Sequence, residues 1–225
     1  MKVIAIDGSP RKHFNTAALV DSFIEGVKIK CPSAECSHIH LYDLTYKGCV
    51  SCLGCRLSNS KTYGVCIHKD DITPVIAESS GADILVLASP IYFGDINGAM
   101  HSFLERLLFP YETYEAGNHT IAPHRMPVVT IYTMNVTEDA FFSKGYNAAI
   151  DMIEHFISNV FTKPQRICSY NTCQVRDYSH YRIEVFSEAD KLAYHKAHWD
   201  ADNHRTFDMG KSIVSQLIEE KTPIS

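Results

Sequence analysis

Short runs of apolar residues recur along the chain, with longer amphipathic stretches between them. The runs cover residues 3–6, 39–41, 84–88, 128–132 and, more weakly, 165–170. Uninterrupted apolar runs are typical of strands that are covered on both faces. Strands that alternate with helices form right-handed βαβ units. The pattern therefore predicts a parallel sheet.

Helical periodicity fills the segments between these runs. Leu19, Phe23 and Val27 recur every four residues and form the apolar stripe of a helix that packs on the sheet. Another helix is expected to begin at Asp70 or Asp71, which we interpret as helix caps. Further helices are expected over residues 97–108, 145–161 and 206–220.

This order of elements predicts an α/β fold. We expect a flavodoxin-like doubly wound sheet of five parallel strands with helices on both faces. In such a sheet, ligands bind beyond the carboxyl ends of the strands, at the switch point between the first and third strands. The loops that follow Asp7 and Ala88 are therefore the places to search for a site.

Composition is that of an ordinary globular protein, so we expect one domain over residues 1–225. Hydrophobic residues make up 45% and charged residues 21% of the chain, which indicates neither a disordered nor a fibrous class. The net charge of −5 comes without a basic run, which argues against nucleic acid as a partner. No apolar stretch reaches the roughly 18 residues of a membrane span, and the apolar start is too short for a signal peptide. We therefore expect a cytoplasmic protein without a membrane partner.

The loop after the first strand has the composition of an anion site. Ser9, Arg11, Lys12, Asn15 and Thr16 follow a glycine and precede the amphipathic helix. Free backbone N–H groups and the helix dipole favour negative charge at such a helix start. The alternative is that Ser9 shapes a turn and Asn15 or Thr16 caps the helix, which leaves the cationic pair unexplained. The loop has neither a Walker nor a GxGxxG pattern, which disfavours ATP and a Rossmann-bound nicotinamide.

The loop after the third strand holds two aromatic rings among a proline and glycines. Its central residues are Pro90, Ile91, Tyr92, Phe93 and Gly94. Backbone N–H groups and ring faces in such a loop suit a flat heterocycle. Taken alone, an ordinary strand-to-helix turn with both rings in the core is the better interpretation.

The two loops together resemble the flavodoxin-like NADPH-dependent FMN reductase family. The resemblance lies in GSPRKxxNT and SPIYFGDINGAMHSFLER and extends over most of residues 1–135. It implies a noncovalent FMN with its phosphate around the anion loop and its ring along residues 90–94. It also implies a third contact loop, which includes Thr133 and Met134. NADH or NADPH would then supply the electrons to FMN, so we assign no catalytic side chain.

Cysteines gather in a loop over residues 48–69, which we call the cysteine loop. They are Cys49, Cys52, Cys55 and, after a ten-residue gap, Cys66. They resemble the cysteines of the iron–sulfur flavoproteins, a branch of the same family, which implies a [4Fe-4S] cluster; here the gap before Cys66 is longer than in that pattern. Zinc and free thiols are the alternatives. A cluster requires the chain to fold back before Cys66, and Gly64 permits such a return.

These features support three functions. We favour an NAD(P)H-dependent FMN oxidoreductase that reduces a quinone, a flavin or another small acceptor. The second is an iron–sulfur flavoprotein that relays single electrons between redox protein partners, and the third is a binding module without turnover. The segments over residues 109–125 and 171–205 are too long for plain connections. We expect their aromatic residues to cover an FMN edge or a partner subunit, and we expect a homodimer or a higher homo-oligomer.

Overall fold

The computed structural model describes residues 1–117 and 120–221 and confirms the predicted α/β architecture. The strands are β1 (Lys2–Asp7), β2 (Glu35–His40), β3 (Ile84–Tyr92), β4 (Asp95–Ile96), β5 (Val128–Thr133) and β6 (Gln165–Ser169). Five of the described strands run parallel in the order β2-β1-β3-β5-β6, while β4 pairs antiparallel with the end of β3. This is the flavodoxin-like order.

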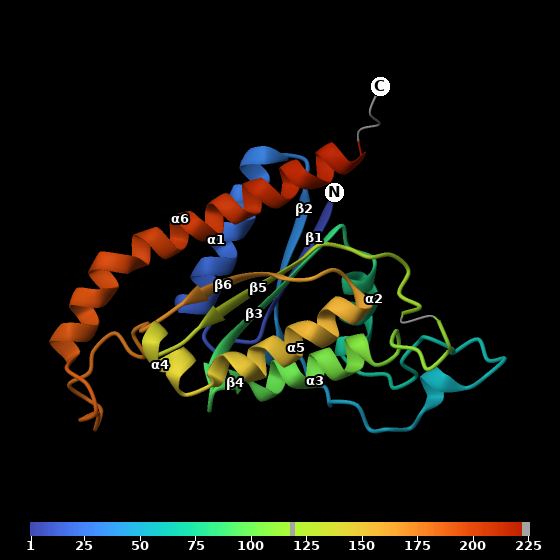
Figure 1. Cartoon of the computed structure of the whole chain (residues 1–225), viewed down its shortest axis with the longest axis horizontal. Coiled ribbons are helices and arrows are strands. Elements are labelled where there is room, and N and C mark those ends of the chain that lie inside the picture. The colour runs from blue at the N-terminus through green and yellow to red at the C-terminus, as the bar shows by residue number, and fades with distance from the viewer. Residues whose placement is uncertain (118–119, 222–225) are drawn as a thin grey trace.

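Helices cover both faces of the sheet (Figure 1). One face carries α1 (Asn15–Lys30) and α6 (Glu188–Lys221). The other carries α2 (Ile72–Ser80), α3 (Gly98–Leu108), α4 (Glu138–Ser143) and α5 (Tyr146–Val160). Side chains alternate between the two faces along each strand. In β1, Val3 and Ala5 pack beneath α1 and α6, whereas Ile4 and Ile6 pack on the opposite face. Within the described ranges, no helix has the length and apolar character to span a membrane.

Several boundaries differ from the sequence-based expectation. β2 begins at Glu35 rather than at residue 39, and neither α4 nor β4 was predicted. The last helix begins at Glu188 rather than at residue 206. Its early turns are held by polar and ring contacts instead of an apolar stripe: Lys191 Nζ donates to the Asn135 carbonyl at 2.7 Å, and the rings of His195 and Trp199 stack. The periodicity of hydrophobic residues does not reveal such contacts.

Two glycines allow α1 and α6 to pack backbone to backbone. A Cβ atom on Gly26 would lie 2.0 Å from the Phe207 carbonyl oxygen, and one on Gly210 would lie 2.2 Å from the Phe23 carbonyl oxygen. Backbone atoms do not move aside as the end of a flexible side chain does. The crossing of the two helices therefore depends on both positions having no side chain.

We predict that Gly26→Ala lowers the free energy of unfolding by about 1–3 kcal/mol, the usual effect of overpacking. In an exposed helix the same change stabilises by up to about 1 kcal/mol, so the sign of the effect is diagnostic. Urea titration would measure it. Gly98→Ala is the matched control, because nothing lies within 4 Å of a Cβ atom there. Equal stability of the two variants would contradict the close crossing.

Candidate functional site

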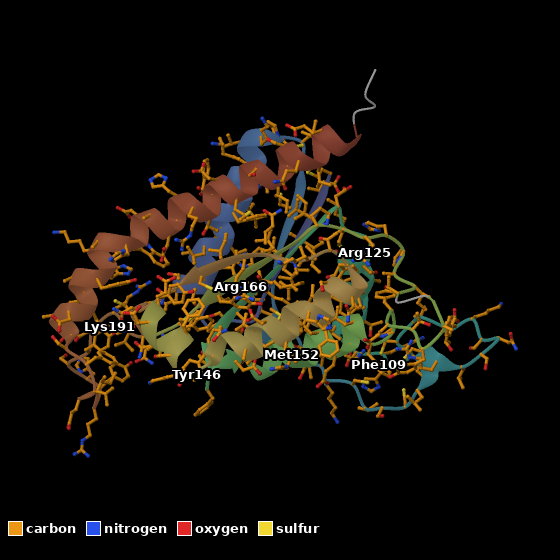
Figure 2. The ribbon with its side chains drawn as sticks, viewed as in Figure 1. Phe109, Arg125, Tyr146, Met152, Arg166 and Lys191 are labelled. Atoms are coloured by element: carbon orange, nitrogen blue, oxygen red, sulfur yellow. The ribbon has the colours of Figure 1, made fainter. Side chains whose placement is uncertain are left out.

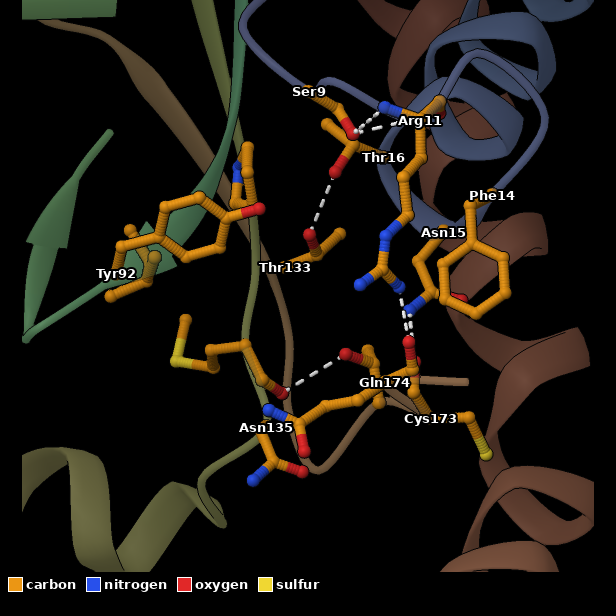
Figure 3. A pocket seen from close by; sticks show the side chains of 14 residues that line it. Ser9, Arg11, Phe14, Asn15, Thr16, Tyr92, Thr133, Asn135, Cys173 and Gln174 are labelled. Atoms are coloured by element: carbon orange, nitrogen blue, oxygen red, sulfur yellow. Dashed lines mark hydrogen bonds between the residues drawn. The ribbon is translucent and has the colours of Figure 1, made fainter. Parts of the chain in front are cut away.

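A pocket opens at the carboxyl ends of β1, β3 and β5, where the fold predicts a ligand site (Figure 3). The residues that line it are Ser9, Arg11, Phe14, Asn15, Thr16, Pro90, Ile91, Tyr92, Thr133, Met134, Asn135, Thr172, Cys173 and Gln174. Residues from all three predicted contact loops therefore meet in one place. A fourth segment, over residues 172–174, completes the wall.

The start of α1 faces this pocket without a side-chain cap. Phe14 occupies the capping position and offers no acceptor, and the first turn holds no acidic residue. Asn15 and Thr16 lie inside the helix, where Asn15 Nδ2 donates to the Cys173 carbonyl at 2.8 Å and Thr16 Oγ1 lies 2.8 Å from Thr133 Oγ1. The capping alternative for these two residues is therefore wrong. The first-turn N–H groups remain suited to an anion.

Ser9 shapes the anion loop from within. Its Oγ accepts a hydrogen bond from the Arg11 amide at 3.1 Å, and its own amide donates to Asp7 Oδ1 at 2.7 Å. The Arg11 guanidinium crosses the pocket mouth to the Gln174 carbonyl (Figure 3). Lys12 does not line the pocket, because its Nζ pairs with Asp43 Oδ1 at 2.6 Å. Of the cationic pair, only Arg11 reaches the site.

A direct contact joins the anion loop to the loop after β3. The Gly8 amide donates to the Ala88 carbonyl at 2.8 Å, and Asn97 Nδ2 donates to the Gly8 carbonyl. Asn97 also caps α3, since its Oδ1 accepts from the Met100 amide at 3.1 Å. A Cβ atom on Gly8 would lie 2.9 Å from Asn97 Oδ1. Only glycine fits here without a shift.

The loop after β3 divides in two. Pro90, Ile91 and Tyr92 line the pocket, as expected. Phe93 has a φ of 53° and a fully exposed ring, so it is not packed in the core. Gly94 has a φ of 85° and lies so close to Tyr146 that a Cβ atom would be 2.6 Å from the ring. Phe93 and Gly94 shape the turn instead of lining the pocket.

Sequence reasoning missed Phe14 and residues 172–174 as pocket residues. Cys173 and Gln174 contribute backbone carbonyls, which accept from Asn15 and Arg11, so their side-chain types carried no signal. Lys191 supports this segment from α6: its buried Nζ donates to the Asn135 carbonyl and, at 3.4 Å, to the Thr172 carbonyl. Burial lowers the pKa of Lys191 to about 8.

The four cysteines of the cysteine loop line a second, separate cavity. The predicted return of the chain occurs at Gly64, which has a φ of 74° and donates its amide to the Cys55 carbonyl at 3.0 Å. Cys55 is buried, whereas Cys49 and Cys52 are exposed. The long gap thus brings Cys66 to the same cavity as the other three.

A buried arginine on α3 organises the cysteine loop. Arg106 Nε lies 3.0 Å from Cys66 Sγ, and its Nη1 donates to Asp70 Oδ2 at 2.9 Å and to the Lys47 carbonyl at 3.0 Å. The neighbouring Glu105 accepts from the Cys49 amide at 2.9 Å. Both ends of the loop are therefore fixed by one helix, whose end carries Phe109 (Figure 2).

The interpretation of Asp70 and Asp71 as helix caps holds only for the position of Asp71, which is the N-cap residue of α2. Asp70 pairs with Arg106, and Asp71 Oδ2 accepts from the Thr45 amide at 2.8 Å. Neither side chain caps α2. Tertiary packing explains this for Asp70, because the buried guanidinium of Arg106 requires a carboxylate partner.

The distances between the four thiols can be compared with those in a metal site. In the described part of the chain, only Asp7, His38 and His40 form a group of three or more possible ligands within 4.8 Å of one another. No three of the loop thiols are that close. Tetrahedral zinc with bonds of about 2.3 Å would hold its sulfurs about 3.8 Å apart, whereas a cluster spreads its ligands over several irons. The thiols therefore do not lie at the spacing of a tetrahedral zinc site.

Comparison with known proteins gives the family. Residues 1–139 match the NADPH-dependent FMN reductase family. The chain belongs to this family. An iron–sulfur flavoprotein of Archaeoglobus fulgidus is 34% identical over 125 residues, which cover 55% of this chain and 57% of that protein. One from Methanocaldococcus jannaschii is 32% identical over 106 residues, 47% of this chain and 51% of that protein. The match thus spans about half the length of these curated relatives.

Solved structures resemble this chain over nearly its whole length. An NAD(P)H:quinone oxidoreductase from Methanothermobacter marburgensis has a TM-score of 0.68 at 12% identity and covers 95% of this chain and 96% of its own. An FMN-dependent NADH-azoreductase from Bacillus anthracis in complex with FMN has a TM-score of 0.61 at 12% identity, covering 96% and 99%. At this identity the likeness establishes the fold.

We predict that Arg106→Leu lowers the free energy of unfolding by about 3–5 kcal/mol, because it leaves the Asp70 carboxylate without its buried partner. Urea titration would measure the loss. Arg125→Leu is the control, since Arg125 is exposed and donates to the Ser158 carbonyl; we expect a change within about 0.5 kcal/mol. Similar values for the two variants would refute a structural role for the buried pair.

The same pair should make stability depend on pH. Burial raises the pKa of Asp70, but hydrogen bonds and charge from Arg106 lower it more, so the net pKa lies below the ordinary value. The stabilisation is then present above about pH 4 and is lost as the pH falls toward the pKa of the folded state. Asp70→Asn should flatten this acid-side decline.

Proposed function

We propose that this protein is an FMN-dependent oxidoreductase that takes electrons from NADH or NADPH and reduces a small acceptor such as a quinone or a flavin. The observation that carries the proposal is the uncapped start of α1, which faces a pocket shared with Arg11 and with the loops after β3 and β5. Membership of the FMN reductase family supports the same cofactor. The NADH or NADPH preference, the acceptor and the oligomeric state stay predictions.

The pocket residues fit the two parts of FMN. The first-turn N–H groups of α1, with Ser9, Arg11, Asn15 and Thr16, would hold the phosphate. Residues 90–92 and 133–134 would lie along the ring system. When bound, FMN supplies hydride and single-electron chemistry, which leaves this chain to bind, orient and shield it. Residues 172–174 would cover the side opposite the loop after β3, held there by Asn15 and Lys191.

We expect the purified protein to carry FMN and not FAD, because the pocket offers one anion-binding loop. Chromatography of heat-released flavin would identify it, and anaerobic addition of NADPH should bleach its absorption. Mainly FAD, or no flavin after reconstitution, would sink the cofactor assignment. FMN that NADH and NADPH leave oxidised would sink the enzymatic proposal while sparing the cofactor.

Arg11 and Lys12 provide a matched pair of variants for this proposal. Arg11→Ala should weaken FMN binding by about 1.5–3 kcal/mol, the range for one charge-assisted hydrogen bond. Lys12→Ala removes a neighbouring charge that pairs with Asp43 outside the pocket, so it should change the affinity far less. Quenching of flavin fluorescence would give both dissociation constants. Equal losses would show that only general charge attracts FMN.

A second candidate function rests on the cysteine loop. The four cysteines share one cavity, and Arg106 donates toward Cys66 Sγ. The curated relatives named above are iron–sulfur flavoproteins. In this alternative Cys49, Cys52, Cys55 and Cys66 hold a [4Fe-4S] cluster, and the protein relays single electrons between redox protein partners.

Protein reconstituted with iron and sulfide without oxygen should contain about four iron atoms per chain and absorb broadly near the flavin bands. Cys52→Ala should lose most of this iron. Cys31→Ala should retain it, because Cys31 follows the end of α1 and lies outside the cavity. Zinc or no metal, with NADPH oxidation undiminished in Cys52→Ala, would refute the cluster and leave the FMN reductase proposal intact.

A further inference from the structure

A cluster of two histidines and an aspartate lies at the edge of the sheet, outside the FMN pocket. β1 and β2 pair with Asp7 opposite His40 and Ala5 opposite His38. Because residues two apart on a strand share a face, both imidazoles lie on the side of the sheet to which Asp7 points. That side is covered by α1. Strand register alone thus gathers these three side chains.

The three side chains point their ligand atoms at one place. His38 Nε2 and His40 Nδ1 each lie 3.3 Å from Asp7 Oδ2. His40 Nδ1 is buried and makes no hydrogen bond. It lies close to the Asp7 carboxylate, but the geometry of this contact is not that of a hydrogen bond. A buried ring nitrogen without a hydrogen bond is costly unless another partner meets it.

The second ring nitrogen of His38 is held as in many metal sites. Its Nδ1 lies 3.0 Å from Asp21 Oδ1 on α1. Histidines that bind metals nearly always donate their other N–H to a carboxylate, a carbonyl or water, which fixes the tautomer and the ring orientation. Asp21 would serve this purpose, because a proton on Nδ1 leaves the Nε2 lone pair directed toward Asp7.

The charges around the cluster leave room for a cation. The charged groups that act on the two imidazoles are Asp7, Asp21, Asp43 and Lys12. Three carboxylates against one ammonium leave an excess of two negative charges, and Asp7 is completely buried. A proton on His38 would offset part of this excess. A divalent ion would offset all of it.

We propose that Asp7, His38 and His40 bind one divalent first-row transition ion, of which zinc is the representative. Tetrahedral bonds of about 2.0–2.1 Å place neighbouring ligand atoms about 3.3–3.4 Å apart, which is the spacing observed from Asp7 Oδ2 to each histidine. Two imidazoles and one carboxylate suit zinc and its neighbours, whereas magnesium prefers oxygen alone. β2 is an edge strand and both histidine side chains are partly exposed, so the ion has an entry path and a place for water.

The site would stiffen the anion loop from behind. Asp7 presents Oδ2 to the proposed ion and Oδ1 to the Ser9 amide, so one carboxylate connects the two. The proposal stands whether or not the protein binds FMN, because all three ligands lie outside the FMN pocket.

Equilibrium dialysis of the full chain against buffered Zn²⁺ tests the proposal, with metal measured per chain. The cysteine loop also binds zinc in principle, so the readout is the difference between wild type and His40→Ala. We expect His40→Ala to lose one equivalent. His180→Ala should lose none, because His180 is exposed, lies 3.5 Å from Asp177 and belongs to no group of three possible ligands.

Two further measurements keep the result decisive. Asp21→Asn alters an exposed side chain that would not touch the ion, and we expect it to weaken zinc binding about 10–100-fold. With Co²⁺ as the probe, the equivalent lost in His40→Ala should carry no thiolate charge-transfer band. Equal metal content in wild type and His40→Ala would overturn the proposal. So would a thiolate band on the lost equivalent or, if His40→Ala fails to fold, an unchanged affinity in Asp21→Asn.

Discussion

The parallel direction of five strands is the constraint on which the site depends. Parallel strands end at the same edge of a sheet, so the loops after β1, β3 and β5 meet there regardless of their separation in sequence. Gly8 joins the loops after β1 and β3, because its amide donates to the Ala88 carbonyl and the absence of a side chain leaves room for Asn97. The same edge leaves the uncapped amides of α1 open to an anion.

Helix α3 connects the FMN pocket with the cysteine loop. Asn97 at its start holds Gly8, and Arg106 near its end holds Cys66. Asn97 and Arg106 are nine positions apart in sequence, which corresponds to about 14 Å along a helix axis. A rigid element therefore sets the separation of the two candidate redox sites, and the orientation of the cysteine loop does not depend on the loop alone.

The fold was predictable from sequence to the extent that apolar periodicity controls it. Apolar runs predicted β1, β3, β5 and β6 closely and only the end of β2, and residue types in two loops predicted most of the pocket. Other features depend on tertiary geometry. Arg11 and Lys12 are both cationic, but an ion pair with Asp43 holds Lys12 outside the pocket. The carbonyls of Cys173 and Gln174 could have come from any residue, and the polar early turns of α6 follow no apolar stripe.

The long gap before Cys66 illustrates how such geometry overrides spacing. Closing a loop costs entropy that grows slowly, by about 0.6 kcal/mol for each doubling of length, so extra residues add little penalty. Here the insertion folds on itself, with Gly64 bonded back to Cys55 and Arg56 bonded to the carbonyls of Phe109 and Glu112. Arg106 then fixes Cys66 from α3. Since a buried arginine rather than the number of intervening residues sets the position of Cys66, a compact spacing is not required to bring the four thiols to one cavity.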